Sequence, residues 1–287
     1  MSILLTLLYL AVIVLLVVCC CGSALYWYEN MNNPEEERIP APKPGLFPCL
    51  VQYFTTLASY FLCAVLAVFG FFLRRKPAPK AVPAEGSAAP DPALPPLILI
   101  HGMYNNGGSW MYMAGLLDKA GYNVSTYGYF SFFTPLDKIL RGLNEHVDTV
   151  QQMTGQKPIL IGHSLGGLLA RKWLAEYNGE DRVRGIITLG TPHEGSKAAV
   201  LAPGELARSI RPNGSLVASL RELPPISLPC TSLVSPADEA VLPSSALIPP
   251  QGWNMRLTPP LPHFSMLFSP RTTDMLLEEL RAIKTGD

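Results

Sequence analysis

The chain has 287 residues, a formal net charge of +0 and 48% hydrophobic residues. Its length is sufficient for one catalytic domain of ordinary size together with an apolar segment. Because acidic and basic side chains balance, the composition argues against a nucleic-acid partner.

Two uncharged apolar runs open the chain, at residues 3–21 and 49–73. As a helix, the first run is about 28 Å long, close to the ~30 Å hydrocarbon core of a bilayer. We therefore predict two membrane spans within residues 1–76. The first alternative is a pair of buried core helices, which seldom lack a charge on every face. The second is a cleaved signal peptide for the first run, but no Lys or Arg precedes it, and Val18 stands where processing prefers a small residue.

The charges that flank the two runs predict an orientation. Glutamates dominate the loop between the runs, whereas a basic cluster follows the second run directly, made of Arg74, Arg75, Lys76 and Lys80. Basic flanks of membrane spans stay on the cytoplasmic side. The sequence thus predicts a hairpin in the inner or plasma membrane, with both ends and the downstream domain in the cytoplasm.

Residues 77–95 are rich in Pro and Ala, which is typical of an extended linker. A chain that starts near Pro90 is therefore expected to fold and act without the hairpin. From residue 96 to 287, short apolar strands alternate with helical periodicity. The expected strands are 97–100, 124–129, 159–162, 183–190, 231–235 and 254–257, and the expected helices are 109–120, 136–153, 168–177 and 271–283. This alternation predicts an α/β domain whose mainly parallel sheet has helices on both faces.

Residues 194–228 form a mixed, cap-like segment between two expected strands. Its apolar residues fall in short helical pairs, such as Leu216 with Leu220, broken by Pro and Gly. The segment could be a mobile lid that presents an apolar face to lipid, or a fixed element that closes one face of the sheet.

Residues 162–166 read Gly-His-Ser-Leu-Gly and lie where an expected strand meets an expected helix. In a Gly-x-Ser-x-Gly turn, the serine is held in a strained conformation that exposes its hydroxyl above the sheet. Glycines flank it because a side chain there would collide with a neighbouring element. The pattern predicts Ser164 as a nucleophile.

An activated serine needs a base, and the base needs an orienting carboxylate. In chains with this turn, the acid and then the histidine follow on loops after later strands. Asp238 follows the expected strand 231–235, and His263 lies between the last strand and the last helix. Glu239 is the alternative acid, although we expect it to face solvent.

The oxyanion formed on acyl attack needs backbone N–H donors. We expect these donors from Leu165, after the nucleophile, and from Met103, in the loop after the first strand. Asn105 and His193 are candidate substrate contacts. For Asn105 the alternative is a plain turn, and for His193 it is a polar residue that anchors the exit of its strand.

Three motifs in order carry a family resemblance: Leu-Ile-Leu-Ile-His-Gly at 97–102, Gly-His-Ser-Leu-Gly-Gly at 162–167 and Leu-Gly-Thr-Pro-His-Glu-Gly at 189–195. The chain after the linker, about two-thirds of the whole, resembles bacterial lipases and esterases and the glycosylphosphatidylinositol inositol-deacylase-like branch of the α/β-hydrolases. The resemblance implies an α/β-hydrolase fold and an esterase or lipase without cofactor or metal. It also implies Ser164, Asp238 and His263 as the catalytic triad.

These observations predict a membrane-anchored serine hydrolase that cleaves carboxylic esters, with acyl esters of lipids as substrates and an acyl-serine intermediate. An acyltransferase or a thioesterase of the same fold is the alternative within the enzymes. A noncatalytic membrane protein that keeps the fold for partner binding is the alternative of another class.

Overall fold

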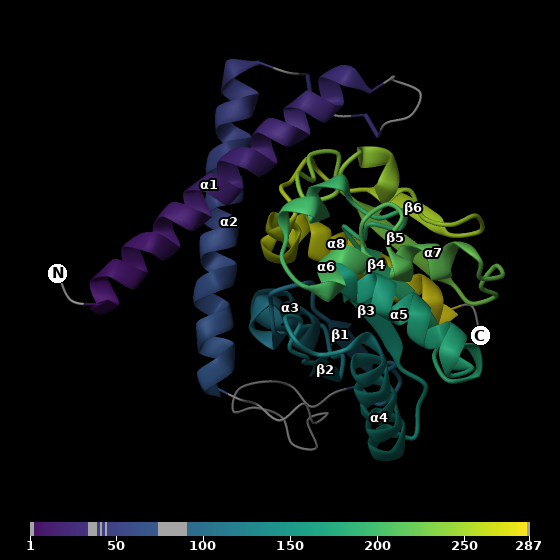
Figure 1. The fold of residues 1–287 in the computed structure, drawn as a ribbon. Coiled ribbons are helices and arrows are strands. Elements are labelled where there is room, and N and C mark those ends of the chain that lie inside the picture. Colours follow the sequence, from purple (N-terminus) through teal and green to yellow (C-terminus); the bar gives the residue numbers. More distant parts are fainter. Residues whose placement is uncertain (1–2, 34–38, 41, 44, 74–90, 286–287) are drawn as a thin grey trace.

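The computed structural model describes residues 3–33, 39–40, 42–43, 45–73 and 91–285. Most of the predicted linker, up to residue 90, lies outside these ranges, as do Glu35, Glu36 and the basic cluster that begins at Arg74. The rest of the chain forms two parts, an N-terminal helix pair and an α/β domain (Figure 1).

The α/β domain is built on one six-stranded sheet with the order β2-β1-β3-β4-β5-β6. Every neighbouring pair in this sheet is parallel. The strands are β1 (Leu97–Ile100), β2 (Val124–Tyr127), β3 (Ile159–His163), β4 (Gly185–Leu189), β5 (Cys230–Val234) and β6 (Asn254–Leu257). The predicted parallel α/β sheet is confirmed, with each expected strand present and some ends shifted by a few residues.

Helices cover both faces of the sheet, because successive residues of a strand point to opposite sides. Leu97 and Leu99 of β1 pack into the core beneath α3 (Met111–Lys119) and α8 (Pro270–Thr285). Ile98 and Ile100 pack into the other core, beneath α4 (Leu136–Thr154) and α5 (Leu165–Glu176).

The cap-like segment folds into three short helices: η4 (Lys197–Leu201), α6 (Glu205–Ser209) and α7 (Ser215–Arg221). Leu206, Ile210, Leu216 and Leu220 are all buried and belong to the same core as α5. Such burial is what the fixed-element alternative expects of this segment.

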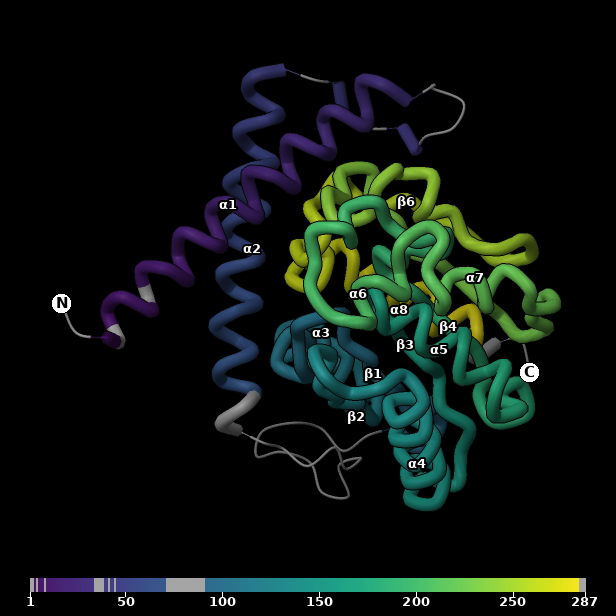
Figure 2. Tube along the Cα trace, in the orientation of Figure 1, coloured from purple at the N-terminus to yellow at the C-terminus, as the bar shows by residue number. Residues whose placement is uncertain are grey.

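The first two helices are α1 (Ile3–Asn32) and α2 (Leu46–Leu73). Both extend beyond the predicted runs. By length and composition, Leu5–Asn32 and Leu46–Gly70 could each cross a membrane, with mean hydropathies of 2.8 and 1.7. The two helices cross each other, and α2 runs along one side of the α/β domain (Figures 1 and 2).

Candidate active site

Ser164 lies at the turn between β3 and α5, with φ 56° and ψ −124°. A non-glycine residue with positive φ is strained, and strained residues of this kind concentrate at functional sites. The Ser164 N–H donates to Leu189 O at 2.9 Å, which fixes the turn against the end of β4. The flanking glycines are required: a Cβ at Gly162 would lie 2.4 Å from the nitrogen of Gly167, and one at Gly166 would lie 2.2 Å from Ile100 O.

His263 and Asp238 form a buried pair at the carboxyl edge of the sheet. His263 Nδ1 lies 2.7 Å from Asp238 Oδ2, and the residues are 3% and 1% exposed. The other carboxylate oxygen accepts hydrogen bonds from the N–H groups of Ala240 and Val241 at 3.0 and 3.1 Å. These bonds hold the carboxylate in the orientation in which it faces the imidazole.

The pKa of His263 is set by opposing effects. Burial lowers it, but the charge of Asp238 and the hydrogen bond to that carboxylate raise it, and the net shift is upward. A histidine supported in this way is a stronger base than a free imidazole.

The acid–base pair lies beside the serine turn. At Gly190, where φ is +55°, a Cβ would be 2.9 Å from Asp238 Oδ2 and 3.2 Å from His263 Nδ1. Gly190 directly follows Leu189, whose carbonyl accepts the Ser164 N–H. The His163 ring lies 4.5 Å from the His263 ring, centroid to centroid, so the turn and the histidine loop are in contact.

The loop after β1 also approaches the serine closely. A Cβ at Gly102 would lie 3.0 Å from Ser164 Cβ, so the glycine allows this close approach. Met103 follows Gly102, and Leu165 begins α5. Both candidate oxyanion donors therefore belong to backbone that adjoins Ser164.

The two candidate substrate contacts lie in different surroundings. His193 is 1% exposed, and its ring nitrogens contact Arg171 Nη1 at 3.3 Å, Ser232 Oγ at 3.3 Å and Thr188 Oγ1 at 3.4 Å. This network is what the strand-anchor alternative expects. The Asn105 side chain contacts the Cys63 thiol of α2.

Glu239 is buried, and the expectation that it faces solvent is wrong. The residue is 1% exposed, and Oε2 accepts the His263 N–H at 2.9 Å. Its Cγ lies beside Gly22 of α1, where a Cβ would make an ordinary van der Waals contact at 3.6 Å. Burial and then the charge of Asp238 raise the Glu239 pKa to about 7. A signal was present in the sequence, because the stretch from Ala240 to Leu242 that follows Glu239 is apolar.

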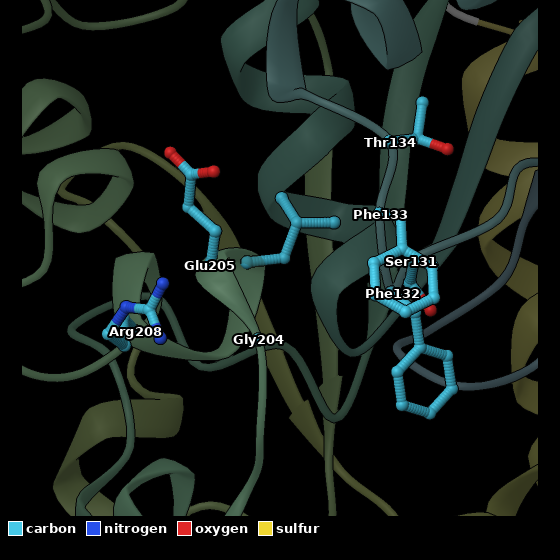
Figure 3. Close-up of a pocket in the computed structure, with 8 residues that line it drawn as sticks. Ser131, Phe132, Phe133, Thr134, Gly204, Glu205 and Arg208 are labelled. Carbon is cyan, nitrogen blue, oxygen red and sulfur yellow. The ribbon is translucent and has the colours of Figure 1, made fainter.

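A cavity of about 310 Å³ lies between the loop after β2 and the α6 segment (Figure 3). It is lined by Ser131, Phe132, Phe133, Thr134, Gly204, Glu205, Leu206 and Arg208. Tyr104, the residue after Met103, stacks on Phe132 with ring centroids 4.5 Å apart, and its N–H donates to Ser131 Oγ at 2.8 Å. These contacts connect the cavity to the candidate oxyanion loop. Within the described ranges, no group of three or more His, Cys, Asp or Glu residues could hold a metal ion.

The parallel sheet and the strained serine between β3 and α5 define an α/β-hydrolase fold. A family model described as "alpha/beta hydrolase fold" matches residues 95–208, which include the serine turn. Among curated proteins, salicylic acid-binding protein 2 of Nicotiana tabacum is 35% identical over 78 residues. That match covers 25% of this chain and 30% of the tobacco protein.

Solved structures support the same fold. The mature lipase BlEst2 of Bacillus licheniformis is similar with a TM-score of 0.58 and 22% identity, over 69% of this chain and 95% of the lipase. Lipase B of Aspergillus fumigatus has a TM-score of 0.61 and 16% identity, over 80% of this chain and 71% of that one. A membrane phospholipase A described as a bacterial virulence factor has a TM-score of 0.50 and 16% identity, over 84% and 98%. The glycosylphosphatidylinositol inositol-deacylase-like branch is not confirmed by these comparisons.

Proposed function

We propose that the protein is a membrane-bound serine hydrolase that cleaves carboxylic esters. The observation that carries this proposal is the buried His263–Asp238 pair, 2.7 Å apart, beside a serine held at positive φ. A strained serine, a histidine and an orienting carboxylate in this chain order are the parts needed for acyl transfer on this fold.

In the proposed mechanism, His263 removes the proton from Ser164 Oγ as the oxygen attacks the ester carbonyl. The tetrahedral oxyanion accepts hydrogen bonds from the N–H groups of Met103 and Leu165. The protonated His263 donates its proton to the leaving alcohol, and an acyl-serine forms. His263 then activates a water molecule that releases the acid and restores Ser164, while Asp238 stabilises the imidazolium in both steps.

We take the substrates to be acyl esters of lipids, because the apolar surface beside the candidate site favours acyl chains. Phe130 and Phe133 are 60% and 85% exposed, and Phe132 lines the cavity next to Tyr104. Exposed aromatic groups of this kind mark a surface that contacts apolar partners. An acyltransferase or thioesterase would use the same groups with another acceptor or leaving group.

The membrane part of the proposal rests on α1 and α2, which have the length and hydropathy of membrane helices. The basic cluster after the second run favours a cytoplasmic location for the α/β domain. A noncatalytic partner-binding protein would need neither the buried acid–base pair nor the strained serine.

Hydrolysis of an ester panel by the full chain in detergent tests the proposal. We expect Ser164→Ala and His263→Ala to lower kcat/KM by about 10⁴-fold or more, and Asp238→Asn to leave more residual activity. Ser227→Ala, which removes an exposed hydroxyl outside the proposed triad and outside the cavity lining, is the matched control and should retain most activity. Near-normal turnover by Ser164→Ala would overturn the mechanism.

A further inference from the structure

Helix α2 has two unlike faces. Gln52, Thr56, Ser59 and Cys63 recur at intervals of four and three residues, so they share one face, and all four are buried. The opposite face is apolar and exposed, and carries Phe47, Leu50, Phe54, Phe61, Leu62, Val68 and Phe69. No residue of α2 is charged. The inner face therefore packs against protein, while the outer face offers an apolar surface that water does not favour.

The first half of the inner face holds the loops of the candidate acid and base. Gln52 Nε2 donates to Ala237 O, next to Asp238, at 3.3 Å. The Tyr60 ring packs edge-on against Phe264, next to His263, with centroids 4.7 Å apart. Both loops are thus in direct contact with α2.

The second half of the inner face holds the loop after β1. Ala67 O accepts a hydrogen bond from Asn106 Nδ2 at 2.8 Å. At Gly108, in η2 (Gly107–Trp110), a Cβ would lie 2.1 Å from Leu66 O, so only glycine permits this approach. Contacts with the domain therefore extend from Gln52 to the region of Gly70, a helical length of about 27 Å.

The two halves of helix α1 lie in different surroundings. In its second half, Cys19, Ser23, Tyr26 and Asn30 are buried at the same four–three spacing, and Tyr26 Oη donates to Pro236 O at 2.7 Å. Its first half projects away from the α/β domain, beyond α2 (Figures 1 and 2). There Val12, Ile13 and Val14 are exposed in succession, so apolar side chains cover every face.

A helix that crosses a bilayer is surrounded by lipid or membrane-embedded protein for about 30 Å. If α2 crossed in its observed packing, the α/β domain beside it would occupy the hydrocarbon core. Exposed ion pairs of the domain, such as Arg221–Glu194, would then be placed in lipid, which strongly disfavours charged side chains. The first half of α1 projects away from the α/β domain (Figure 1) and can enter lipid without it.

We propose that α2 lies along the surface of one leaflet without crossing it, and that the first half of α1 inserts into the same bilayer. The exposed apolar face of α2 contacts acyl chains, and its polar face carries the candidate catalytic loops. One helix diameter, about 10 Å, then separates these loops from the lipid. This placement does not depend on the proposed hydrolase activity, and it differs from the crossing hairpin that the charge pattern predicts.

Protease protection of the full chain tests the placement. A recognition sequence for a site-specific protease is inserted after Lys43, between the two helices, and a second after Lys80, before the domain. The chain is reconstituted into sealed vesicles of phosphatidylcholine and phosphatidylglycerol and digested from outside. If α2 does not cross, each molecule is cut at both sites or at neither, whatever its orientation. If α2 crosses, each molecule is cut at one site only, which overturns the proposal.

Detergent should expose both sites in every molecule, which controls for access. Should the doubly altered chain fail to fold, two chains with one insertion each, in vesicles of uniform orientation, give the same distinction.

Flotation of the chain with these vesicles tests whether lipid covers the outer face of α2. Phe61→Asp should weaken this flotation severalfold. If Phe61→Asp instead converts a dimer to a monomer and leaves flotation unchanged, a second copy covers this face and the proposal fails. Fluorophosphonate labelling of the same samples reports the serine site separately.

Discussion

Helices α4 and α2 have opposite arrangements of polar and apolar residues. In α4, Leu143 and Val147 are buried in the domain core, while the ion pair Asp137–Arg141 is exposed. In α2, Gln52 is buried against the domain and Phe61 is exposed. The same hydrophobic effect explains both patterns if the medium outside α4 is water and the medium outside α2 is lipid.

One carboxylate placed on each helix should give the largest difference between α4 and α2. Leu143→Asp puts an unpaired carboxylate in the core and should destabilise the domain by at least about 4 kcal/mol. Phe61→Asp, 58% exposed in the native chain, should change thermal stability in detergent by less than about 0.5 kcal/mol. Thermal unfolding of both variants measures the difference, and similar losses would mean that the outer face of α2 is packed against protein.

Removing the helix pair tests its contribution to the site. The sequence alone predicts that a chain starting near Pro90 folds and is active. The contacts of α2 with three loops at the site predict instead that this chain loses about tenfold or more in kcat/KM on soluble short esters, because small displacements of catalytic groups are costly. Undiminished turnover by the shortened chain would show that these contacts are dispensable.

The cap-like segment offers a smaller test. Leu216 is 1% exposed and packs in the core of α5, so Leu216→Ser should cost about 2–5 kcal/mol. We expect equal losses of activity on micellar long-chain and soluble short-chain esters, with a lower melting temperature. A selective loss on micellar substrates, without a change in melting temperature, would favour a mobile lid.

Glu239→Gln should give the smallest change in melting temperature, and the size of this change depends on pH. Because burial raises the pKa of Glu239 in the folded chain, the folded state binds the proton more tightly, and native stability falls as pH rises from about 4.5 through 7. The neutral glutamine should therefore raise the melting temperature at pH 8 and change little at pH 4.5. Loss of the Glu239 charge should also lower the pKa of His263, which shifts the acidic limb of kcat/KM to lower pH.

If the melting temperature of Glu239→Gln falls at pH 8, the buried carboxylate stabilises the fold, and the raised pKa of Glu239 is wrong. The variant keeps an oxygen that can accept the His263 N–H, so the hydrogen bond itself is not removed.

Much of the fold follows from local sequence patterns. The strand 97–100 is a continuous apolar run, as expected for a strand covered on both faces, and Ser164 lies in a turn whose glycines are dictated by neighbouring backbone. The proximity of Asp238 and His263 could be predicted because the carboxyl ends of parallel strands lie at one edge of the sheet. Each of these features depends on short segments of the chain.

The features that could not be predicted depend on contacts between distant segments. Glu239 is buried between segments that lie far apart in sequence: its Oε2 accepts the His263 N–H, and its Cγ lies beside Gly22 of α1. The polar face of α2 is visible as a spacing from Gln52 to Cys63, but its partners in three separate loops are not. Spacing along a helix shows which residues share a face and does not identify what that face contacts.

The most direct test of the proposed serine nucleophile is to map the adduct of a fluorophosphonate probe on the full chain by mass spectrometry. We expect stoichiometric modification of the peptide that contains Ser164, which His263→Ala slows by several orders of magnitude and Ser164→Ala abolishes. Absence of an adduct on the folded chain, or an adduct on another residue that persists in Ser164→Ala, would contradict it.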